Sequence, residues 1–139
     1  MPERPSTYQV RPIGWVQSSL REVAEAPNQA DRSAPTAWLV LAPEIRDGAR
    51  DVEAGQQLLV LTWLHLARRD ELATVPGNDP GGRERGVFST RSPNRPNPIG
   101  LHPVTVLAVE PDRIQVNGLE AVDGTPVIDL KPPIRPAEH

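Results

Sequence analysis

The strongest core segment of the chain is QQLLVLTWLHLA, at residues 56–67. Its β-branched and aromatic residues favour a strand, because such side chains pack well on a pleated surface. The nearly continuous apolar run predicts burial on both faces of that strand. For so short a run, periodicity alone leaves a helix open as the alternative.

Shorter segments of similar character lie on both sides of this core segment. Alternation or short apolar runs, bounded by turn residues, predict strands there. The stretch TAWLVLAPE is expected to form a buried strand that ends at Pro43. The other predicted strands are residues 8–18, 86–89, 101–110, 114–122 and the part of 123–134 that contains Val127 and Ile128. The total is six or seven strands.

The remaining segments are predicted as turns and loops. Two long loops are expected at residues 19–35 and 68–85, and a helical turn is expected within residues 44–55. The 17 prolines also argue against long helices. Many short strands are best protected when the sheet closes on itself. We therefore predict an all-β, single-domain β-barrel over residues 1–139, with long ordered loops and little helix.

Composition excludes several kinds of function. The chain has no cysteine, so it has no disulfide or thiolate metal site, and zinc would have to rely on His65, His102 and carboxylates. We expect no metal. The N-terminal stretch MPERPSTYQV has no apolar core, and no window is long enough to cross a bilayer. We expect no membrane contact and a cytoplasmic location. The signatures of P-loop, dinucleotide-binding, zinc-protease and nucleophile-elbow sites are absent.

Charge is distributed unevenly along the chain. The net charge of -3 opposes nonspecific binding of nucleic acid by the whole surface. Residues 83–95, however, hold four arginines and a single acid, Glu84. This cluster predicts either a local anion-binding patch or a solvated arginine face. Lys131 is the only lysine in the chain.

The stretch GVFSTRSPNRPNPIG, at residues 86–100, holds three prolines in fifteen positions. Proline removes a backbone donor and fixes φ, which rules out a helix and a central strand. A rigid extended loop remains, and it presents Arg91, Asn94, Arg95 and Asn97. These side chains are expected either to contact a ligand or to brace the loop through bonds to its backbone.

This loop and the stretch DGTPVIDLKPP, at residues 123–133, resemble the TsaA-like, or TrmO, family of S-adenosylmethionine-dependent tRNA methyltransferases. The family's hallmarks run close to G-V-F-A-T-R-S-P-x-R-P-N-P-I-G and D-G-T-P-V-x-D-I-K-P-Y. The resemblance extends to RPIGWVQSS, APNQA and LLVLTWLH, and covers about residues 11–134. It implies a single-sheeted barrel that acts as a homodimer. The implied reaction methylates N6 of threonylcarbamoyl-adenosine at position 37 of tRNA.

The resemblance also implies particular site residues. Contacts to S-adenosyl-L-methionine would fall on Pro27, Gln29, His65, Leu66, Arg91, Leu101, Asp123, Gly124, Thr125 and Pro126. The catalytic residues would be Asp129 and Lys131. A guanidinium can bind a carboxylate or phosphate with two parallel bonds, which suits Arg91. A carboxylate can accept the proton that adenine N6 loses, which suits Asp129, while Lys131 would orient it or bind a substrate phosphate.

Each of these assignments has a simpler alternative. His65 at a strand end is compatible with a structural, hydrogen-bonded histidine. Asp123 and Gly124 form a type I′ turn signal. Asp129 and Lys131, two residues apart on one face, are compatible with an exposed ion pair of little energetic weight.

The sequence also departs from the family in three places. Asn28 stands where arginine is common, Pro133 where tyrosine is common, and His102 where serine is common. A missing tyrosine bears on the substrate more than on the cofactor. Two alternatives to the tRNA enzyme therefore stay open: a methyltransferase of a small-molecule substrate, and an S-adenosylmethionine-binding module without turnover.

Overall fold

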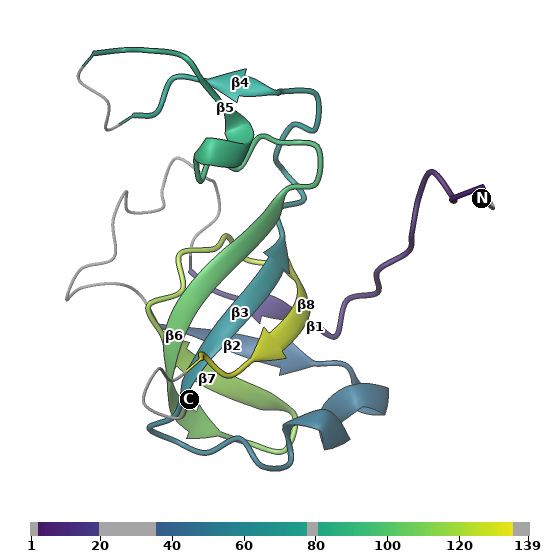
Figure 1. Cartoon of the computed structure of the whole chain (residues 1–139). Coiled ribbons are helices and arrows are strands. Elements are labelled where there is room, and N and C mark those ends of the chain that lie inside the picture. The colour runs from purple at the N-terminus through teal and green to yellow at the C-terminus, as the bar shows by residue number, and fades with distance from the viewer. Residues whose placement is uncertain (1–2, 20–35, 78–80, 135–139) are drawn as a thin grey trace.

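The computed structural model describes residues 3–19, 36–77 and 81–134, and its main body is a closed antiparallel barrel (Figure 1). Six strands follow one another around it in the order β1-β2-β7-β6-β3-β8, and β8 pairs with β1 to close the ring. Their bounds are Gly14–Gln17 (β1), Thr36–Leu41 (β2), Gln57–Trp63 (β3), Ile99–Val109 (β6), Arg113–Asn117 (β7) and Pro126–Lys131 (β8). The predicted all-β barrel is confirmed. Within the described ranges, no helix is both long and apolar enough to span a membrane.

The core segment forms β3, and its side chains alternate between the inside and the outside of the barrel. Leu58, Val60 and Thr62 are buried, whereas Leu59, Leu61 and Trp63 are half-buried. The prediction that both faces of this strand are buried is therefore wrong. In an antiparallel barrel without covering helices, the outer face of each strand is open to solvent. A strand is buried on both faces only where layers cover both sides of the sheet, as in a parallel sheet between helices.

Several other predicted boundaries differ from the structure. The first strand is short, because residues 8–13 form no strand, and β2 ends at Leu41. The expected helical turn is a 3-10 helix, Pro43–Ala49 (η2). The loop predicted at 68–85 contains a two-stranded hairpin of β4 (Ala73–Thr74) and β5 (Arg85–Gly86). Of the loop predicted at 19–35, residues 20–35 lie outside the described residues.

The predicted strand at residues 86–89 is wrong, because Val87–Ser89 form a 3-10 helix (η3). The Thr90 amide donates to the Val87 carbonyl at 3.1 Å and closes the turn. The Thr90 hydroxyl donates to the same carbonyl at 3.1 Å. Two donors on one carbonyl favour the turn over an extended strand.

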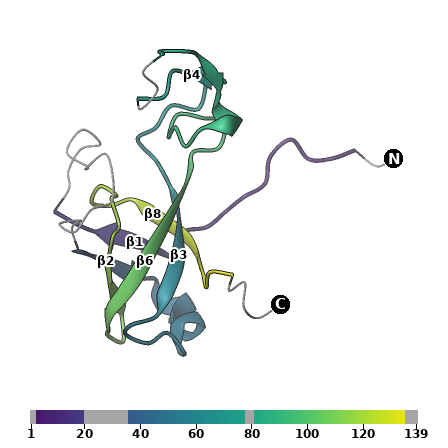
Figure 2. The same cartoon turned by 60° about the vertical axis from the view of Figure 1, so that its left-hand side comes forward.

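Residues 64–77 and 81–98 lie outside the barrel, between β3 and β6 in the sequence, and form an arm that carries β4, β5 and η3 (Figures 1 and 2). The arm and η2 lie at opposite ends of the barrel in both views. At its base, the Leu64 amide donates to the Pro98 carbonyl at 2.7 Å. This bond continues the β3–β6 ladder by one step, so the two ends of the arm are held side by side.

The proline loop is braced by polar side chains. The Arg95 guanidinium donates to the carbonyls of Val87, Thr90 and Ser92 at 2.8, 3.0 and 3.1 Å. The Arg68 amide donates to Asn94 Oδ1 at 2.8 Å, and Arg69 Nε donates to the Pro96 carbonyl at 2.9 Å. For Asn94 and Arg95, the bracing alternative is therefore what the structure shows.

A polar pair lies inside the otherwise apolar barrel. Thr62 Oγ1 and His102 Nε2 are 2.9 Å apart, and Thr62 is fully buried. Burial lowers the pKa of His102 to about 4, because the surrounding core disfavours a charged imidazole. The ring is therefore neutral at pH 7.

Replacing Gly14 by alanine should weaken the barrel, because a Cβ there would overlap the Val40 carbonyl oxygen on the neighbouring strand. We expect a loss of about 1–3 kcal/mol in the free energy of unfolding, measured by urea denaturation. The matched control is Gly48→Ala in η2, where a Cβ meets nothing within 4 Å. Equal stability of the two variants would contradict this close approach of β1 and β2.

Stability should fall as the pH is lowered from 7 towards 4. Between the ordinary histidine pKa of 6.5 and the folded value of about 4, the unfolded chain binds a proton at residue 102 that the folded chain does not. We expect His102 to account for about 1–2 kcal/mol of lost stability at pH 5. His102→Gln should remove that part of the pH dependence. An unchanged difference between pH 7 and pH 5 in the variant would disprove the assignment.

Replacing Arg95 by alanine should loosen the proline loop, since the carbonyls of Val87, Thr90 and Ser92 each lose a hydrogen bond, although Val87 keeps its two bonds from Thr90. We expect a cost of about 1–3 kcal/mol and faster hydrogen exchange at residues 87–95. Arg95→Lys should not rescue the loop, because one ammonium cannot reproduce the fork of a guanidinium. Arg91→Ala is the control and should keep wild-type stability, because Arg91 is exposed. Slow exchange in Arg95→Ala would show that the prolines alone hold the loop.

Candidate functional site

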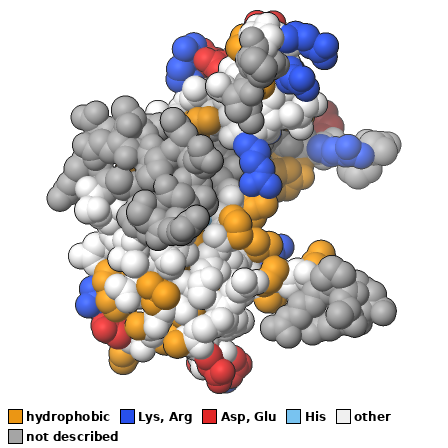
Figure 3. All heavy atoms as spheres, turned by 90° about the vertical axis from the view of Figure 1, so that its left-hand side faces the viewer, with side chains coloured by type: hydrophobic (Ala, Val, Ile, Leu, Met, Phe, Trp, Pro, Cys, Tyr) orange, Lys and Arg blue, Asp and Glu red, His pale blue; other side chains and the backbone are white. Residues whose placement is uncertain are grey.

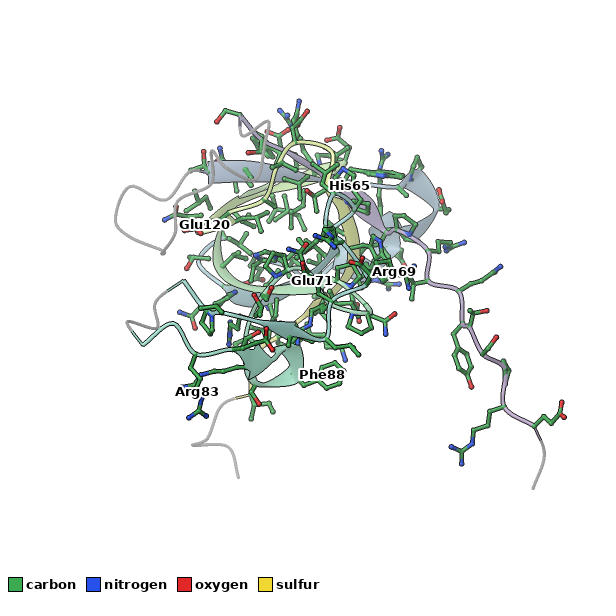
Figure 4. All side chains as sticks on the ribbon, turned by 90° about the horizontal axis from the view of Figure 1, so that it is seen from above. His65, Arg69, Glu71, Arg83, Phe88 and Glu120 are labelled. Carbon is green, nitrogen blue, oxygen red and sulfur yellow. The ribbon has the colours of Figure 1, made fainter. Side chains whose placement is uncertain are left out.

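A pocket of about 80 Å³ opens at the end of the barrel that carries the arm. One wall comes from the start of the arm, and the other comes from the segment between β7 and β8. His65 and Glu120 stand on these two walls (Figure 4). The lining residues are Leu64, His65, Leu66, Ala67, Glu120, Ala121, Val122 and Thr125. We call it the His65 pocket.

The second wall ends in a tight turn at residues 122–125. The Thr125 amide and hydroxyl both donate to the Val122 carbonyl, at 3.2 and 2.7 Å. Only the glycine of the central pair, Gly124, has a positive φ, at +85°. A type I′ turn needs a positive φ at both central residues, so that prediction for Asp123 and Gly124 is wrong. The turn lies on the connection from β7 to β8, and these two strands are not paired with each other. It is therefore not a hairpin turn, and the strand twist that favours type I′ in hairpins does not apply to it.

The turn is attached to the end of β1. The Gly124 amide donates to the Val16 carbonyl at 2.7 Å, and the Val16 amide donates to the Thr125 carbonyl at 2.9 Å. The Asp123 carboxylate accepts the amide of Ser18 at 2.9 Å. These bonds fix the acidic turn beside the point where the chain continues into residues 20–35.

The structure gathers part of the predicted cofactor set in one place. His65, Leu66 and Thr125 line the His65 pocket, and Asp123, Gly124 and Pro126 belong to the same turn and strand start as Thr125. Pro98, at the end of the proline loop, is bonded to Leu64 of the pocket wall. The proline-rich and acidic motif segments therefore flank the same end of β3.

Two of the predicted cofactor residues lie outside the lining of the His65 pocket, and two others are not among the described residues. Arg91 is exposed on the arm. Leu101 points outward from β6, with 47% of its surface exposed. Pro27 and Gln29 lie outside the described residues.

Asp129 and Lys131 lie on the outer face of the barrel rather than in the His65 pocket. Leu61 is paired with Leu101 on one side and with Asp129 on the other, and Lys131 is paired with Leu59. Asp129 Oδ1 accepts the amide of Leu130 at 2.9 Å. Asp129 and Lys131 form no ion pair within the described part of the chain, so that alternative is not what the structure shows.

A larger pocket, of about 350 Å³, lies between η2 and β8. Its walls are mainly apolar, and they include Ile13, Leu41, Ile45 and Leu130. Asp51 and Asp129 add carboxylates to its lining. Asp129 thus borders this space as well as the outer row that contains Leu61 and Leu101.

Sequence reasoning missed Glu120 as a pocket residue. Residues 114–122 were expected to form one strand, but β7 ends at Asn117 and Gly118 turns the chain with a φ of +96°. The signal available in the sequence was a single acid, Glu120, in the otherwise apolar stretch GLEAV.

The lining of the His65 pocket indicates the kind of ligand it can take. A carboxylate, an imidazole and a threonine around apolar walls suit a ligand with an apolar body and a positive group. No group of three or more metal-ligating side chains occurs within residues 3–19, 36–77 and 81–134.

Comparison with known proteins agrees with this geometry. A "Probable S-adenosyl-L-methionine-binding protein" of Archaeoglobus fulgidus is 45% identical over 124 residues, which cover 89% of this chain and 33% of that protein. An "S-adenosyl-L-methionine-binding protein" of the same organism is 43% identical over 122 residues, covering 88% and 86%. The crystal structure of TrmO from Pseudomonas aeruginosa superposes with a TM-score of 0.76 at 29% identity, over 95% of this chain and 58% of that one.

The chain therefore spans a third of the first relative and somewhat over half of the solved TrmO chain. The family model described as "tRNA-methyltransferase O N-terminal domain" matches residues 15–138, which is most of the chain. By this match and by its barrel, the chain belongs to the family of the tRNA-methyltransferase O N-terminal domain.

Proposed function

We propose that this chain binds S-adenosyl-L-methionine at the His65 pocket and transfers its methyl group to N6 of threonylcarbamoyl-adenosine at position 37 of tRNA. The observation that carries the proposal is the meeting of the two motif segments at the pocket, through the Leu64–Pro98 bond and the Thr125 turn. Family membership and the names of the two relatives support it.

The residues present fit such a cofactor. Apolar walls from Leu64 and Leu66 suit its adenine, and the carboxylates of Glu120 and Asp123 suit its positive groups. Arg91 is a partner of the right charge for its carboxylate. At about 80 Å³ the pocket holds only part of such a molecule, since sites of this class usually measure about 300–1,000 Å³. Pro27, Gln29, Arg91 and Leu101 are therefore proposed to contact the remainder.

A second copy of the chain would complete the site. Exposed apolar side chains follow the outer face of β6, where Ile99, Leu101 and Leu107 have 43%, 47% and 41% of their surface exposed. Figure 3 shows hydrophobic side chains running down the molecule on one side. A homodimer through this face would cover them. It would also bring the Leu101–Leu61–Asp129 row against the partner.

In the proposed reaction the cofactor supplies an electrophilic methyl group. The C–N bond to N6 forms as the bond between the methyl group and sulfur breaks, and a neutral thioether leaves. The chain's own residues have two tasks. Asp129 accepts the proton that N6 loses, and Lys131 holds Asp129 or a substrate phosphate. Because Asp129 lies outside the His65 pocket, this proposal requires the second copy of the chain to bring the outer row of one subunit to the pocket of the other. Positioning of the two reactants supplies most of the remaining acceleration. The tRNA substrate places this reaction in the cytoplasm.

Two alternatives to this reaction remain. The names of both relatives state binding of S-adenosylmethionine and do not mention turnover, so a binding module without catalysis is kept as an alternative. A small-molecule substrate is the other alternative, because Pro133 stands in place of the family's tyrosine. The experiment below separates these cases by the methylated product.

Calorimetric titration with S-adenosyl-L-methionine should give saturable binding. His65→Ala and Arg91→Ala should each weaken it at least about tenfold, which corresponds to one charge-assisted or well-placed contact. The control is Arg50→Ala, which removes an exposed arginine at the opposite end of the barrel. Absence of binding to the wild type would overturn the whole proposal.

Turnover is then measured on tRNA that carries the threonylcarbamoyl group, with mass spectrometry of its nucleosides. Asp129→Asn should lower kcat about 10²- to 10⁴-fold and leave cofactor affinity unchanged. Asp112→Asn, at an exposed turn, is the matched control. Cofactor binding without any methylated product would support the binding module. Cofactor binding with methylation of a small adenosine derivative, but not of tRNA, would support the small-molecule enzyme.

A further inference from the structure

We propose that the arm is an RNA grip, in which Phe88 stacks on an unpaired base while Arg83 and Arg85 hold the neighbouring phosphates. We call these three residues the Phe88 platform. The inference rests on the proposed function and deepens it, because it assigns where the RNA substrate is held. It uses residues outside the His65 pocket and outside the outer-face row.

Phe88 is an aromatic residue of the arm whose side chain is exposed to solvent. It has 80% of its surface in solvent, whereas its neighbour Val87 has 1%. Val87 thus anchors η3, and Phe88 points away from the anchor (Figure 4). Phe88 is also the only phenylalanine in the chain. Leu66, Leu72 and Val75 are also exposed on the arm, but among its described residues Phe88 is the only aromatic one. Its ring provides a flat face for stacking on a base.

The backbone under this ring is held in place. The Val87 amide donates to the Leu72 carbonyl at 2.9 Å, and the Val87 carbonyl accepts from Arg95 at 2.8 Å. The amide of Thr90 closes the turn on the same carbonyl at 3.1 Å. A ring on such a fixed turn loses little freedom when a base stacks on it, and this favours binding.

The arginines of the arm divide into two groups. Arg68 is bonded to Asp70 and Glu71, and its hydrogen bond lowers the pKa of Asp70. Arg69 lies 5.1 Å from the centre of the Trp63 ring and holds the proline loop, as Arg95 does. These three are used inside the arm.

The second group is exposed to solvent and consists of Arg83, Arg85 and Arg91. Arg83 makes no hydrogen bond or ion pair with any described residue, whereas Arg85 does have an interaction within the chain. Arg85 lies in β5, directly before η3. Figure 4 shows Arg83 and Phe88 projecting from the same edge of the arm, away from the barrel. An RNA strand laid along this edge would meet both Arg83 and the ring of Phe88.

Charge over the molecule supports a polyanion as the ligand of this end. Residues 83–95 carry four arginines and one acid, whereas residues 43–55, around η2, carry four acids and two arginines. The arm and η2 lie at opposite ends of the barrel, and Figure 3 shows basic side chains gathered at the arm. An RNA would be attracted to the arm and repelled from the far end, which orients it towards the His65 pocket.

The test uses the full chain and a fluorescent anticodon stem-loop RNA, with binding followed by anisotropy at several salt concentrations. Phe88→Ala should weaken binding about 5- to 150-fold, the usual effect of losing one stacked base, and Phe88→Trp should restore it. The double change Arg83→Gln with Arg85→Gln should reduce the slope of log affinity against log salt by about 1.5. The matched control is Tyr8→Ala, which removes another aromatic ring that is 80% exposed.

Cofactor affinity and oligomeric state are measured on the same variants and should stay at the wild-type values. RNA affinity of Phe88→Ala equal to that of Tyr8→Ala would overturn the inference. So would a change of oligomeric state in Phe88→Ala, because the ring would then serve a protein contact. If RNA binding depends on Phe88 but no tRNA is methylated, the grip stands and the proposed reaction fails. If tRNA is methylated equally well by Phe88→Ala, with unchanged KM, the reaction stands and the grip fails.

Discussion

The pairing of β3 with β6 is the constraint on which the rest of the molecule depends. Gln57–Trp63 runs antiparallel to Ile99–Thr105, and the Leu64–Pro98 bond continues the ladder beyond the barrel wall. The same pairing buries Val60 inside and exposes Leu101 outside. It thereby fixes the base of the arm, one wall of the His65 pocket and the outer-face row together. A slip of one residue in this register would exchange the inner and outer side chains of both strands.

The arginines show how one side chain type serves several purposes in a small protein. Arg95 donates to three carbonyls of a loop in which the prolines supply no amide donors. Arg69 joins the proline loop to the ring of Trp63 at the arm's base. Arg69 and Arg95 thus hold the arm together. Fewer arginines of the arm are therefore available to a ligand than the number in the sequence suggests, and these lie around η3.

The sequence predicted the barrel and most of its strands, because alternation and turn residues are local signals. It placed the strands of residues 36–43, 101–110 and 123–134 close to β2, β6 and β8. It missed the β4–β5 hairpin, since four strand residues between glycines and prolines carry too weak a pattern. It also missed Glu120, because the pocket arises only when β7 ends at Gly118 and the chain turns back. The internal use of Arg69 depends on the Pro96 carbonyl, which is distant in the sequence. The use of Arg95 depends on how the loop around it turns, and no simple sequence pattern predicts either.

The closed base of the arm has a consequence for how such a protein can diversify. Residues 64 and 98 are joined by a hydrogen bond between neighbouring strands, so everything between them is an insertion into a connection that could have been short. The entropic cost of a longer connection grows only with the logarithm of its length. The part of this segment between the pocket wall at residues 64–67 and the proline loop can therefore change in sequence and size while the ring of strands keeps its register. A scaffold of this kind can acquire new substrates by replacing one appendage.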